Sequence, residues 1–375
     1  MVERKILLNP GPATTTDTVK LAQVVPDICP REAEFGQVMR ELGQGLLQIV
    51  HAAPEKYSCV LFCGSGTLVI EACVTSLVPA GKKMLFVNNG SYTSRAVEIA
   101  KACGVPYVEL QLPIDKPADI SRVAQALEVD KDIAVVYITH QETGTGLLNP
   151  IREIGRIAHA HGAWMVADTI STLAMRPIDI ERDNLDFCMS SAQKGIQAMT
   201  GLSFIIGRTD YIKASQVFPR HSYYSNIYLQ YDSFERSGQM RFTPPVQVIY
   251  AARQALKEYF AEGETGKWQR HQKTMAAIHA GLAELGFCEV LPHDYQAGLV
   301  ATVRYPDDPG WDFTQVHDYC YAHGFTIYPG KMQQVGTFRL CALGAITSED
   351  IKDFFVVFRK ALDQLGIVLP VHYGA

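Results

Sequence analysis

Short apolar runs alternate with segments of helical periodicity through the first two-thirds of this chain. Runs of about four to eight residues rich in Val and Ile are typical of strands, whereas a repeat every three to four residues is typical of helices. Near-continuous apolar strands alternating with helices indicate a mostly parallel sheet covered on both faces, so the pattern predicts an α/β fold. The predicted strand–helix pairs, in chain order, are 58–62 with 67–77, 84–87 with 91–103, 107–112 with 120–127, and 132–139 with 150–161.

Three further strands are predicted after these pairs, at 164–167, 187–190 and 203–206. The last two follow closely without a helix between them. The chain is therefore not a simple repeat of one strand–helix unit.

The last third of the chain has a different pattern, in which two long helical segments, 245–260 and 267–285, come first. The remaining predicted elements are a strand at 299–305, a helix at 313–323, strands at 325–328 and 337–342, and a helix at 348–365 preceded by a weak capping box of Thr347 and Asp350. This order predicts a second, smaller domain. We expect a large domain of residues 15–255 and a small domain of residues 256–375, to which the N-terminal segment 1–14 belongs.

Composition narrows the class of protein further. The chain has 375 residues, of which 47% are hydrophobic and 19% charged, an ordinary balance for a globular protein of two or three domains. Its formal net charge of -5 and its lack of basic blocks argue against non-specific binding to nucleic acid. No apolar run approaches the ~20 residues that cross a bilayer, and the first residues do not form a signal peptide. We expect a cytoplasmic protein without membrane contact.

Cysteine and histidine usage points away from disulfides and metals. The nine cysteines are scattered, odd in number and contain no C-x-x-C pair, which predicts reduced thiols and no zinc knuckle. The eleven histidines show no recognisable ligand spacing. The sequence therefore predicts no metal site.

Two residues at the ends of apolar runs are candidates for chemistry. Lys194 follows the strand 187–190 and precedes a glycine, and an amine withdrawn from water at the mouth of a strand has a lowered pKa and can act as a nucleophile. Taken alone, a surface lysine in a turn is the commoner interpretation. Asp168 ends the strand 164–167, where a carboxylate needs either a positive partner or a role as an N-cap. Both are expected at the carboxyl edge of one sheet, where a carboxylate and an amine suit a cofactor with a basic ring nitrogen and a reactive aldehyde.

The segment Gly64-Ser65-Gly66-Thr67 lies between a predicted strand and a predicted helix. Its small residues let backbone N–H groups converge on an anion, and its two hydroxyls add donors. It is neither a Walker loop nor G-x-G-x-x-G, so a small phosphate fits better than a nucleotide. On its own this signal is weak, because Gly/Ser turns are common at such positions.

A polar loop, residues 140–146, follows the strand 132–139 at the same predicted edge. Thr143 is placed to donate a hydrogen bond to a ring hydroxyl, whereas His140 and Glu142 are either functional or structural groups that satisfy the backbone. Tyr92 opens a predicted helix and is either a flat face for an aromatic ring or a partly buried structural tyrosine.

Together these residues resemble the class V branch of the fold-type-I pyridoxal-phosphate enzymes, relatives of the alanine/serine–glyoxylate aminotransferases. The likeness covers nearly the whole chain. It implies a large domain with a seven-stranded sheet between helices and a small C-terminal α+β domain. The segments that carry it are 7–12, 64–67, 89–92, 140–150, Asp168, 190–194, 241–245, 328–331 and 338–340.

The resemblance implies pyridoxal 5′-phosphate as the cofactor and a role for each matching residue. Lys194 would bind the aldehyde as a Schiff base and shuttle the proton, and Asp168 would pair with the ring nitrogen. Arg339 matches an arginine that grips the substrate carboxylate through its planar fork. A homodimer with shared active sites is implied. The other implied cofactor contacts are Ser65, Gly66, Thr67 and Gln193 around the phosphate, Tyr92 on the ring face, Thr143 at the phenolic oxygen, and Thr243, which in relatives reaches the neighbouring subunit's cofactor.

Within that family the motifs are most similar to the 2-aminoethylphosphonate–pyruvate aminotransferase branch. This implies transfer of the amino group of 2-aminoethylphosphonate to pyruvate, giving phosphonoacetaldehyde and L-alanine. A phosphonate dianion requires further donors, for which Arg31 and Arg241 are candidates, although either is equally an ordinary surface arginine. The chain departs from the pattern of that branch at 9–13, 29–32 and Gln193.

These departures leave other reactions open. One alternative is an aminotransferase of the alanine/serine–glyoxylate type. Another is a pyridoxal-phosphate-dependent lyase that acts on a related aminophosphonate. A non-catalytic binding protein is the third, and it would need neither Lys194 nor Asp168.

Overall fold

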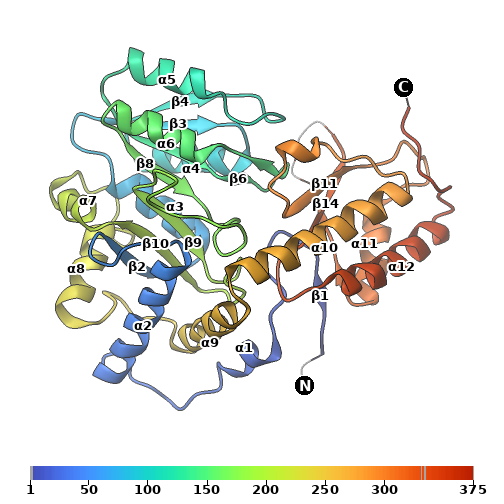
Figure 1. Cartoon of the computed structure of the whole chain (residues 1–375), viewed down its shortest axis with the longest axis horizontal. Coiled ribbons are helices and arrows are strands. Elements are labelled where there is room, and N and C mark those ends of the chain that lie inside the picture. The colour runs from blue at the N-terminus through green and yellow to red at the C-terminus, as the bar shows by residue number, and fades with distance from the viewer. Residues whose placement is uncertain (1–2, 331, 333–334, 375) are drawn as a thin grey trace.

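The computed structural model of the chain describes residues 3–330, 332 and 335–374. Figure 1 shows a large part, built on a central sheet with helices on both faces, beside a smaller part rich in helices. Within the described residues, no helix is both long enough and apolar enough to pass through a membrane.

A seven-stranded sheet forms the centre of the large part. In spatial order its strands are β2 (Tyr57–Cys63), β10 (Leu202–Arg208), β9 (Phe187–Ser191), β8 (Trp164–Asp168), β5 (Ile133–Thr139), β3 (Lys83–Asn88) and β4 (Tyr107–Gln111). β10 is antiparallel to both of its neighbours, and the other neighbouring pairs are parallel. The predicted α/β class, its mostly parallel sheet and its seven strands are confirmed.

Each face of this sheet has its own hydrophobic core, because alternate side chains of a strand point to opposite faces. In β3, Leu85 and Val87 belong to one core, and Met84 and Phe86 belong to the other. Burial on both faces explains why these strands are continuous apolar runs. The first core is closed by α2 (Ala33–Ile49), α5 (Ile120–Val129), α6 (Ile151–Ala160) and α9 (Val246–Glu262), and the second by α3 (Gly66–Ser76), α4 (Ser91–Ala102), α7 (Thr209–Ala214) and α8 (Ile227–Ser237).

Four helices have no counterpart in the sequence prediction, namely α1 (Asp17–Leu21), α2, α7 and α8. The longest of them, α2, has 17 residues and contains Gly36, Gly43 and Gly45, which disfavour an isolated helix. Gly45 lets α2 approach α9, because a Cβ at that position would lie 2.8 Å from Leu256 Cδ1. Tertiary packing rather than helix propensity therefore stabilises α2.

The smaller part contains α10 (Glu264–Glu284), α11 (Phe313–Ala322) and α12 (Ser348–Gln364), packed on a three-stranded antiparallel sheet. The strands of that sheet are β11 (Val300–Arg304), β14 (Thr337–Cys341) and β13 (Tyr328–Pro329), whereas β1 (Ile6–Leu7) pairs in parallel with β12 (Phe325–Thr326). The predicted capping box of Thr347 and Asp350 is confirmed at the start of α12.

The prediction of one strand at 325–328 is wrong. The chain crosses from one sheet to another at the buried Ile327, so that β12 pairs with β1 and β13 pairs with β14. Pro329 has no N–H to donate, which confines β13 to a short edge strand. Lys331, the last residue of the motif that begins at Tyr328, lies outside the described residues.

The division into domains at residues 255 and 256 stays a prediction. Ile6 and Leu8 share a hydrophobic core with side chains of α10, α11 and α12, so the N-terminal segment packs against the smaller part. The proposed boundary falls inside α9. The remaining short elements are β6 (Gln141–Glu142), β7 (Leu147–Leu148), η1 (Ser215–Val217) and η2 (His293–Tyr295).

Candidate active site

The carboxyl ends of β5, β8 and β9 meet at one edge of the large sheet, and both residues predicted to carry chemistry lie there. Asp168 is the last residue of β8 and pairs in register with Thr139 of β5 and Met189 of β9. Lys194 lies in the turn that follows β9. The two side chains are close enough for their charges to interact. The tertiary structure thus brings this amine and this carboxylate together.

Asp168 is 2% exposed and is held by two donors. The Ile170 N–H donates to Oδ1 at 2.9 Å, and the Tyr137 hydroxyl donates to Oδ2 at 3.3 Å. Burial raises the pKa of Asp168 to about 6, although both donors and Lys194 oppose that increase. The segment after Asp168 forms turns rather than a helix, so the bond to Ile170 is a local turn contact and not a helix N-cap.

The amine of Lys194 faces the N-terminal segment of the chain. Its Nζ donates a hydrogen bond to the carbonyl of Pro10. Gly11 adopts φ +129°, and a Cβ at this glycine would lie 2.6 Å from Nζ, so no larger residue fits here without displacing the lysine. Burial lowers the pKa of Lys194, and the nearby Tyr92 and Asp168 offset that decrease only in part. The segment 7–12 therefore closes over the amine.

The turn that carries Lys194 is fixed by Gly195 and Lys267. The backbone of Gly195 packs against the carbonyl of Leu173, where a Cβ would overlap the oxygen. Lys267 of α10 is 2% exposed, and its Nζ donates to the carbonyl of Gly195 at 2.6 Å. Burial lowers the pKa of Lys267 to about 7. A buried amine of the smaller part thus holds the peptide unit next to Lys194.

The start of α3 faces the same edge of the sheet. Ser65 is its N-cap residue and makes no side-chain capping bond, and a helix start without such a cap can bind an anion through its N–H groups. A Cβ on Gly66 would lie 2.9 Å from Ile170 Cδ1 and 3.5 Å from Ser191 Oγ, so Gly66 lets the helix end approach the ends of β8 and β9. Within the described residues, the buried Ser191 Oγ and Gln193 Oε1 have no hydrogen-bond partner.

The loop after β5 positions Tyr92. Both carboxylate oxygens of the buried Glu142 accept backbone N–H groups at the start of α4, from Tyr92 at 3.0 Å and from Thr93 at 2.9 Å. His140 is also buried, and its Nδ1 lies 3.0 Å from Thr172 Oγ1. Burial lowers the pKa of His140 to about 3, so its ring is neutral. These contacts favour the structural interpretation of both His140 and Glu142.

Arg339 and Thr143 meet on the other side of this loop. Arg339 of β14 is 2% exposed, and its Nη1 donates to the carbonyl of Thr143 at 3.1 Å. Its Nε and Nη2 donate to the carbonyl of Pro329 at 3.2 Å and 2.9 Å. Among the described residues no carboxylate forms an ion pair with Arg339, and a buried guanidinium without a counter-ion is ready to receive an anion. The buried Thr143 Oγ1 likewise lacks a partner in the described part of the chain.

Arg31, Arg241 and Thr243 lie apart from this group, in a second cluster around the segment 239–243. Arg31 Nη1 donates to the carbonyl of Met240 at 2.7 Å. Arg241 Nη1 donates to the carbonyl of Tyr223 at 2.6 Å, and its guanidinium lies over the Tyr223 ring. Thr243 is exposed. None of the contacts described for Arg31 and Arg241 reaches Lys194, Asp168 or Arg339.

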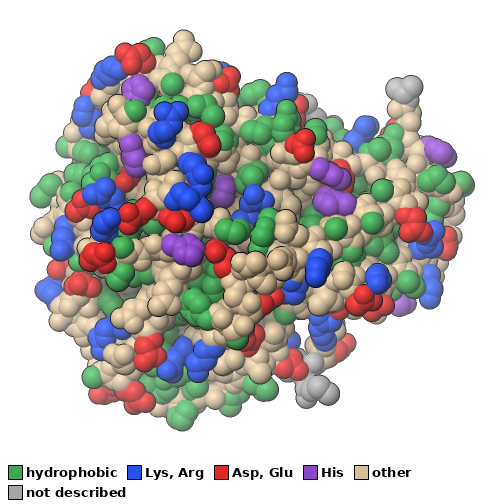
Figure 2. Space-filling view, in the orientation of Figure 1, with side chains coloured by type: hydrophobic (Ala, Val, Ile, Leu, Met, Phe, Trp, Pro, Cys, Tyr) green, Lys and Arg blue, Asp and Glu red, His purple; other side chains and the backbone are tan. Residues whose placement is uncertain are grey.

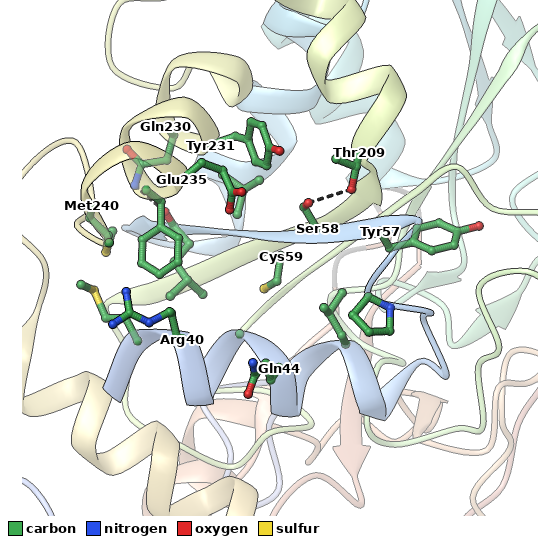
Figure 3. A pocket seen from close by; sticks show the side chains of 18 of the residues that line it. Arg40, Gln44, Tyr57, Ser58, Cys59, Thr209, Gln230, Tyr231, Glu235 and Met240 are labelled. Atoms are coloured by element: carbon green, nitrogen blue, oxygen red, sulfur yellow. Dashed lines mark hydrogen bonds between the residues drawn. The ribbon is translucent and has the colours of Figure 1, made fainter. Parts of the chain in front are cut away.

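Two cavities differ in their relation to the predicted site. A cavity of about 530 Å³ lies at the sheet edge formed by β2, between α2 and α8, and Figure 3 shows Arg40 and Gln44 on one side and Glu235 on the other. None of the predicted site residues lines it. A cavity of about 330 Å³ instead borders the loop that contains Thr143, and among its lining residues are Gly90, Glu142, Gly144 and Thr145.

A mostly parallel sheet whose carboxyl edge combines a buried amine, a buried acid and a helix start without a capping side chain suits a pyridoxal-phosphate enzyme. Residues 20–307 match the family described as Aminotransferase class-V, and the chain belongs to this family. It is a pyridoxal 5′-phosphate-dependent aminotransferase of fold type I.

Individual relatives cover almost the whole chain. A 2-aminoethylphosphonate–pyruvate transaminase of Paraburkholderia phymatum is 34% identical over 96% of this chain and 97% of its own. A protein of the same name from Lysinibacillus sphaericus is 33% identical over 92% of this chain and 94% of its own. The solved structure of an alanine–glyoxylate aminotransferase from Nostoc sp. has a TM-score of 0.88 at 24% identity and covers 96% of each chain, which shows a shared fold.

The residues at the sheet edge fit pyridoxal 5′-phosphate. Ser191, Gln193 and Thr143 each leave a buried polar atom without a partner among the described residues, and the start of α3 has no capping side chain. Buried polar groups are normally paired, so these atoms indicate a polar ligand at this position. The carboxylate of Asp168 and the amine of Lys194 lie at the same edge of the sheet.

Sequence reasoning did not identify three residues that shape this site. Tyr137 donates to Asp168, Lys267 holds the peptide next to Lys194, and Ser191 presents an unpaired hydroxyl. Tyr137 lies inside the apolar strand β5 and Ser191 is the last residue of β9, and only the sheet register shows which face each side chain reaches. Lys267 lies in a long helix and has no local feature that separates it from a surface lysine.

Proposed function

We propose that this aminotransferase moves the amino group of 2-aminoethylphosphonate to pyruvate, giving phosphonoacetaldehyde and L-alanine. The observation that carries the proposal is the group of relatives named for this reaction, which match nearly the full chain at about one-third identity. Arg339 is buried and has no carboxylate partner among the described residues, which supports a keto acid as one substrate.

Lys194 is the central residue of the proposed mechanism. The cofactor, when bound, supplies an aldehyde that takes up the amino group and a ring that accepts electrons from the adjacent carbon. Lys194 would hold the cofactor through its aldehyde. Once the substrate amine had taken its place, the amine of Lys194 would accept a proton from the substrate carbon, a role that its lowered pKa favours. That carbon carries no carboxylate in 2-aminoethylphosphonate, so proton loss is the route open to it.

The other residues hold the reactants in place. Asp168 would keep the ring nitrogen protonated, and the Tyr137 hydroxyl and the Ile170 N–H fix the position of the Asp168 carboxylate. Ser65, Gly66, Thr67 and Gln193 would hold the phosphate, Tyr92 would pack on the ring, and Thr143 would donate a hydrogen bond to the phenolic oxygen. In the second half of the reaction Arg339 binds the carboxylate of pyruvate, and Lys194 returns the proton to the carbon that becomes Cα of alanine.

We further propose a homodimer in which Thr243 reaches the cofactor phosphate of the partner subunit. Its exposure within one chain supports this role, because an exposed threonine is free to contact a second copy. Arg31 and Arg241 lie close to the same segment and are the candidates to bind the phosphonate group across the interface. The proposed location is the cytoplasm.

The test is an assay of the purified holoenzyme with 2-aminoethylphosphonate and pyruvate. We expect alanine and phosphonoacetaldehyde in equal amounts. Turnover of alanine with glyoxylate, but not of 2-aminoethylphosphonate with pyruvate, would move the assignment to the glyoxylate aminotransferases. Release of ammonia without a keto acid would indicate a lyase.

A further inference from the structure

Two histidines and a glutamate converge in the smaller part, away from the residues of the aminotransferase site. Glu289 Oε1 lies 2.6 Å from Nδ1 of His279 on α10 and 3.2 Å from Nε2 of His293 in η2. The three ligand-type atoms all lie within 4.8 Å of one another, and the two imidazole rings have centroids 4.3 Å apart. Figure 2 shows neighbouring histidine side chains on this face, over the region of α10 and β11.

The carboxylate of Glu289 is held in a defined orientation. Gln296 Nε2 donates to its second oxygen, Oε2, at 2.8 Å, so Oε1 is directed at the two imidazoles. Glu289 also forms a backbone bridge with Val303 of β11. Among the described residues, neither Lys nor Arg forms an ion pair with Glu289, and the only basic side chains within 4.0 Å of its carboxylate are the two histidines.

This donor set and its spacing suit a divalent metal ion. Imidazole nitrogen and carboxylate oxygen are common zinc ligands, and with metal–ligand distances of about 2.0–2.2 Å the donor atoms of a tetrahedral site lie ~3.4 Å apart. The Glu289–His279 and Glu289–His293 separations, 2.6 Å and 3.2 Å, differ from that value by less than one ångström, and the three donor atoms all lie within 4.8 Å of one another. The amide of Gln296 supplies the outer hydrogen bond that usually orients a metal-binding carboxylate.

We propose that His279, Glu289 and His293 form a binding site for Zn²⁺ or a chemically similar divalent ion, with water completing the coordination. The His293 side chain is 65% exposed, which leaves a path for the ion and for that water. Histidine spacing along the chain predicted no metal site, because His279 is separated from the other two residues by the end of α10 and a turn.

The site is linked through the backbone to the loop that contains Thr143. Gln296 forms a bridge with Leu147, and the next residue, Ala297, donates its N–H to the carbonyl of Gly146 at 3.0 Å. A metal ion would tie η2 to α10 and so restrain the segment 289–297. We therefore expect amide hydrogen exchange to slow in residues 289–297 and in 144–148 when the ion binds.

The test uses the desalted holoenzyme, first treated with a chelator and then titrated with Zn²⁺ by calorimetry. We expect one ion per chain, with affinity reduced at least about ten-fold in His279→Ala, in His293→Ala and in Glu289→Gln. Titration with Co²⁺ should produce visible ligand-field bands that these variants lack. Glu289→Gln keeps the shape of the side chain, so it remains informative if a histidine variant does not fold.

Two matched variants separate this site from other metal-binding groups. Cys288→Ser tests the exposed thiol next to Glu289, and His317→Ala removes a histidine of α11 outside the cluster. Both should bind Zn²⁺ as the unmodified protein does. Absence of stoichiometric binding, or equal binding in all three cluster variants and the unmodified protein, would overturn the proposal. Aminotransferase activity is not used as the readout, so this outcome is independent of the proposed reaction.

Discussion

Lys267 and Gly195 form a hydrogen bond between the two parts of the molecule, from Nζ of the lysine to the glycine carbonyl at 2.6 Å. The bond holds the peptide unit adjacent to Lys194, although Lys267 belongs to α10 and Gly195 follows β9. Lys267 thus holds the turn that carries Lys194, so the position of the amine proposed to react depends on how α10 packs against the sheet.

The buried Lys267 predicts a specific dependence of stability on pH. Its pKa is about 7 in the folded chain, against an ordinary value near 10.5 in the unfolded chain. Below pH 7 both states are protonated and the cost of burying the charge is fully present. As pH rises from 7 towards 10.5 the unfolded state binds more protons, so this lysine makes stability rise.

Lys267→Met removes that dependence. We compare the free energies of unfolding of Lys267→Met and the unmodified chain by urea unfolding of cofactor-stripped protein. Between pH 6 and pH 9.5 the value for the variant should fall relative to that of the unmodified chain by about 1–3 kcal/mol. The control is Lys257→Met, which removes an exposed lysine of α9 and should give a difference that does not change with pH. The same flat difference for Lys267→Met would contradict the prediction.

Asp168 should make stability depend on pH in the opposite direction, and at lower pH than Lys267 does. Its pKa of about 6 exceeds the ordinary 3.8, so between these values the folded state binds more protons and stability falls as pH rises. In cofactor-stripped protein, Asp168→Asn should be more stable than the unmodified chain at pH 8, by on the order of 1–3 kcal/mol, and this gain should vanish near pH 4. Thermal unfolding across this range measures it.

Loss of the charge of Asp168 should also lower activity. We expect kcat of the holoenzyme to fall about 10²- to 10³-fold in Asp168→Asn, because an uncharged amide no longer stabilises a positive ring nitrogen. Borohydride should still attach the cofactor to Lys194. Nearly full activity would remove Asp168 from the proposed mechanism.

A side chain at position 11 should displace Lys194. In Gly11→Ala the new Cβ would lie 2.6 Å from Nζ, so the lysine must move, and we expect the amount of cofactor bound after purification to fall several-fold. Gly104→Ala is the matched control, since Gly104 has φ +66° and no atom lies within 4 Å of the position that its Cβ would take. It introduces the backbone strain of a positive φ without a clash. Equal cofactor content in both variants would argue against contact between Gly11 and the amine.

Replacement of Thr143 by valine should affect protein stability and cofactor binding in opposite directions. Its buried hydroxyl has no partner among the described residues, so Thr143→Val should leave the cofactor-stripped protein equally stable or more stable. The same change removes a donor from the proposed cofactor site, and we expect affinity for pyridoxal 5′-phosphate to fall about ten-fold. Calorimetric titration and thermal unfolding separate the two effects. Unchanged cofactor affinity would place the hydroxyl outside the site.

Replacement of Arg339 should slow the half-reaction with pyruvate more than the half-reaction with 2-aminoethylphosphonate. Arg339→Lys keeps the charge but loses the planar fork, so we expect KM for pyruvate to rise at least about ten-fold. The half-reaction with 2-aminoethylphosphonate, which has no carboxylate, should change much less. Single-turnover spectra of the cofactor measure each half separately. Equal losses in both would indicate that Arg339 acts mainly through its bonds to Thr143 and Pro329.

Local pattern predicted the large sheet well, because its strands are buried on both faces and are nearly continuous runs of apolar residues. The end of such a run also marked Asp168 and Lys194. The local sequence pattern did not predict α2, because its three glycines disfavour a helix that packing against α9 stabilises. It also failed at 325–328, because a short apolar run does not reveal that its two halves belong to different sheets.

By itself the sequence determined the class of the protein, its family and the identity of the amine and the acid at the sheet edge, since each depends on residues that are adjacent in the chain. Only the tertiary structure decided which groups support them. The contact between Lys267 and Gly195, the closure of Gly11 over Lys194 and the convergence of His279, Glu289 and His293 all join segments from different elements. Such contacts depend on how helices and strands pack, and that packing has no signature in the local order of residues.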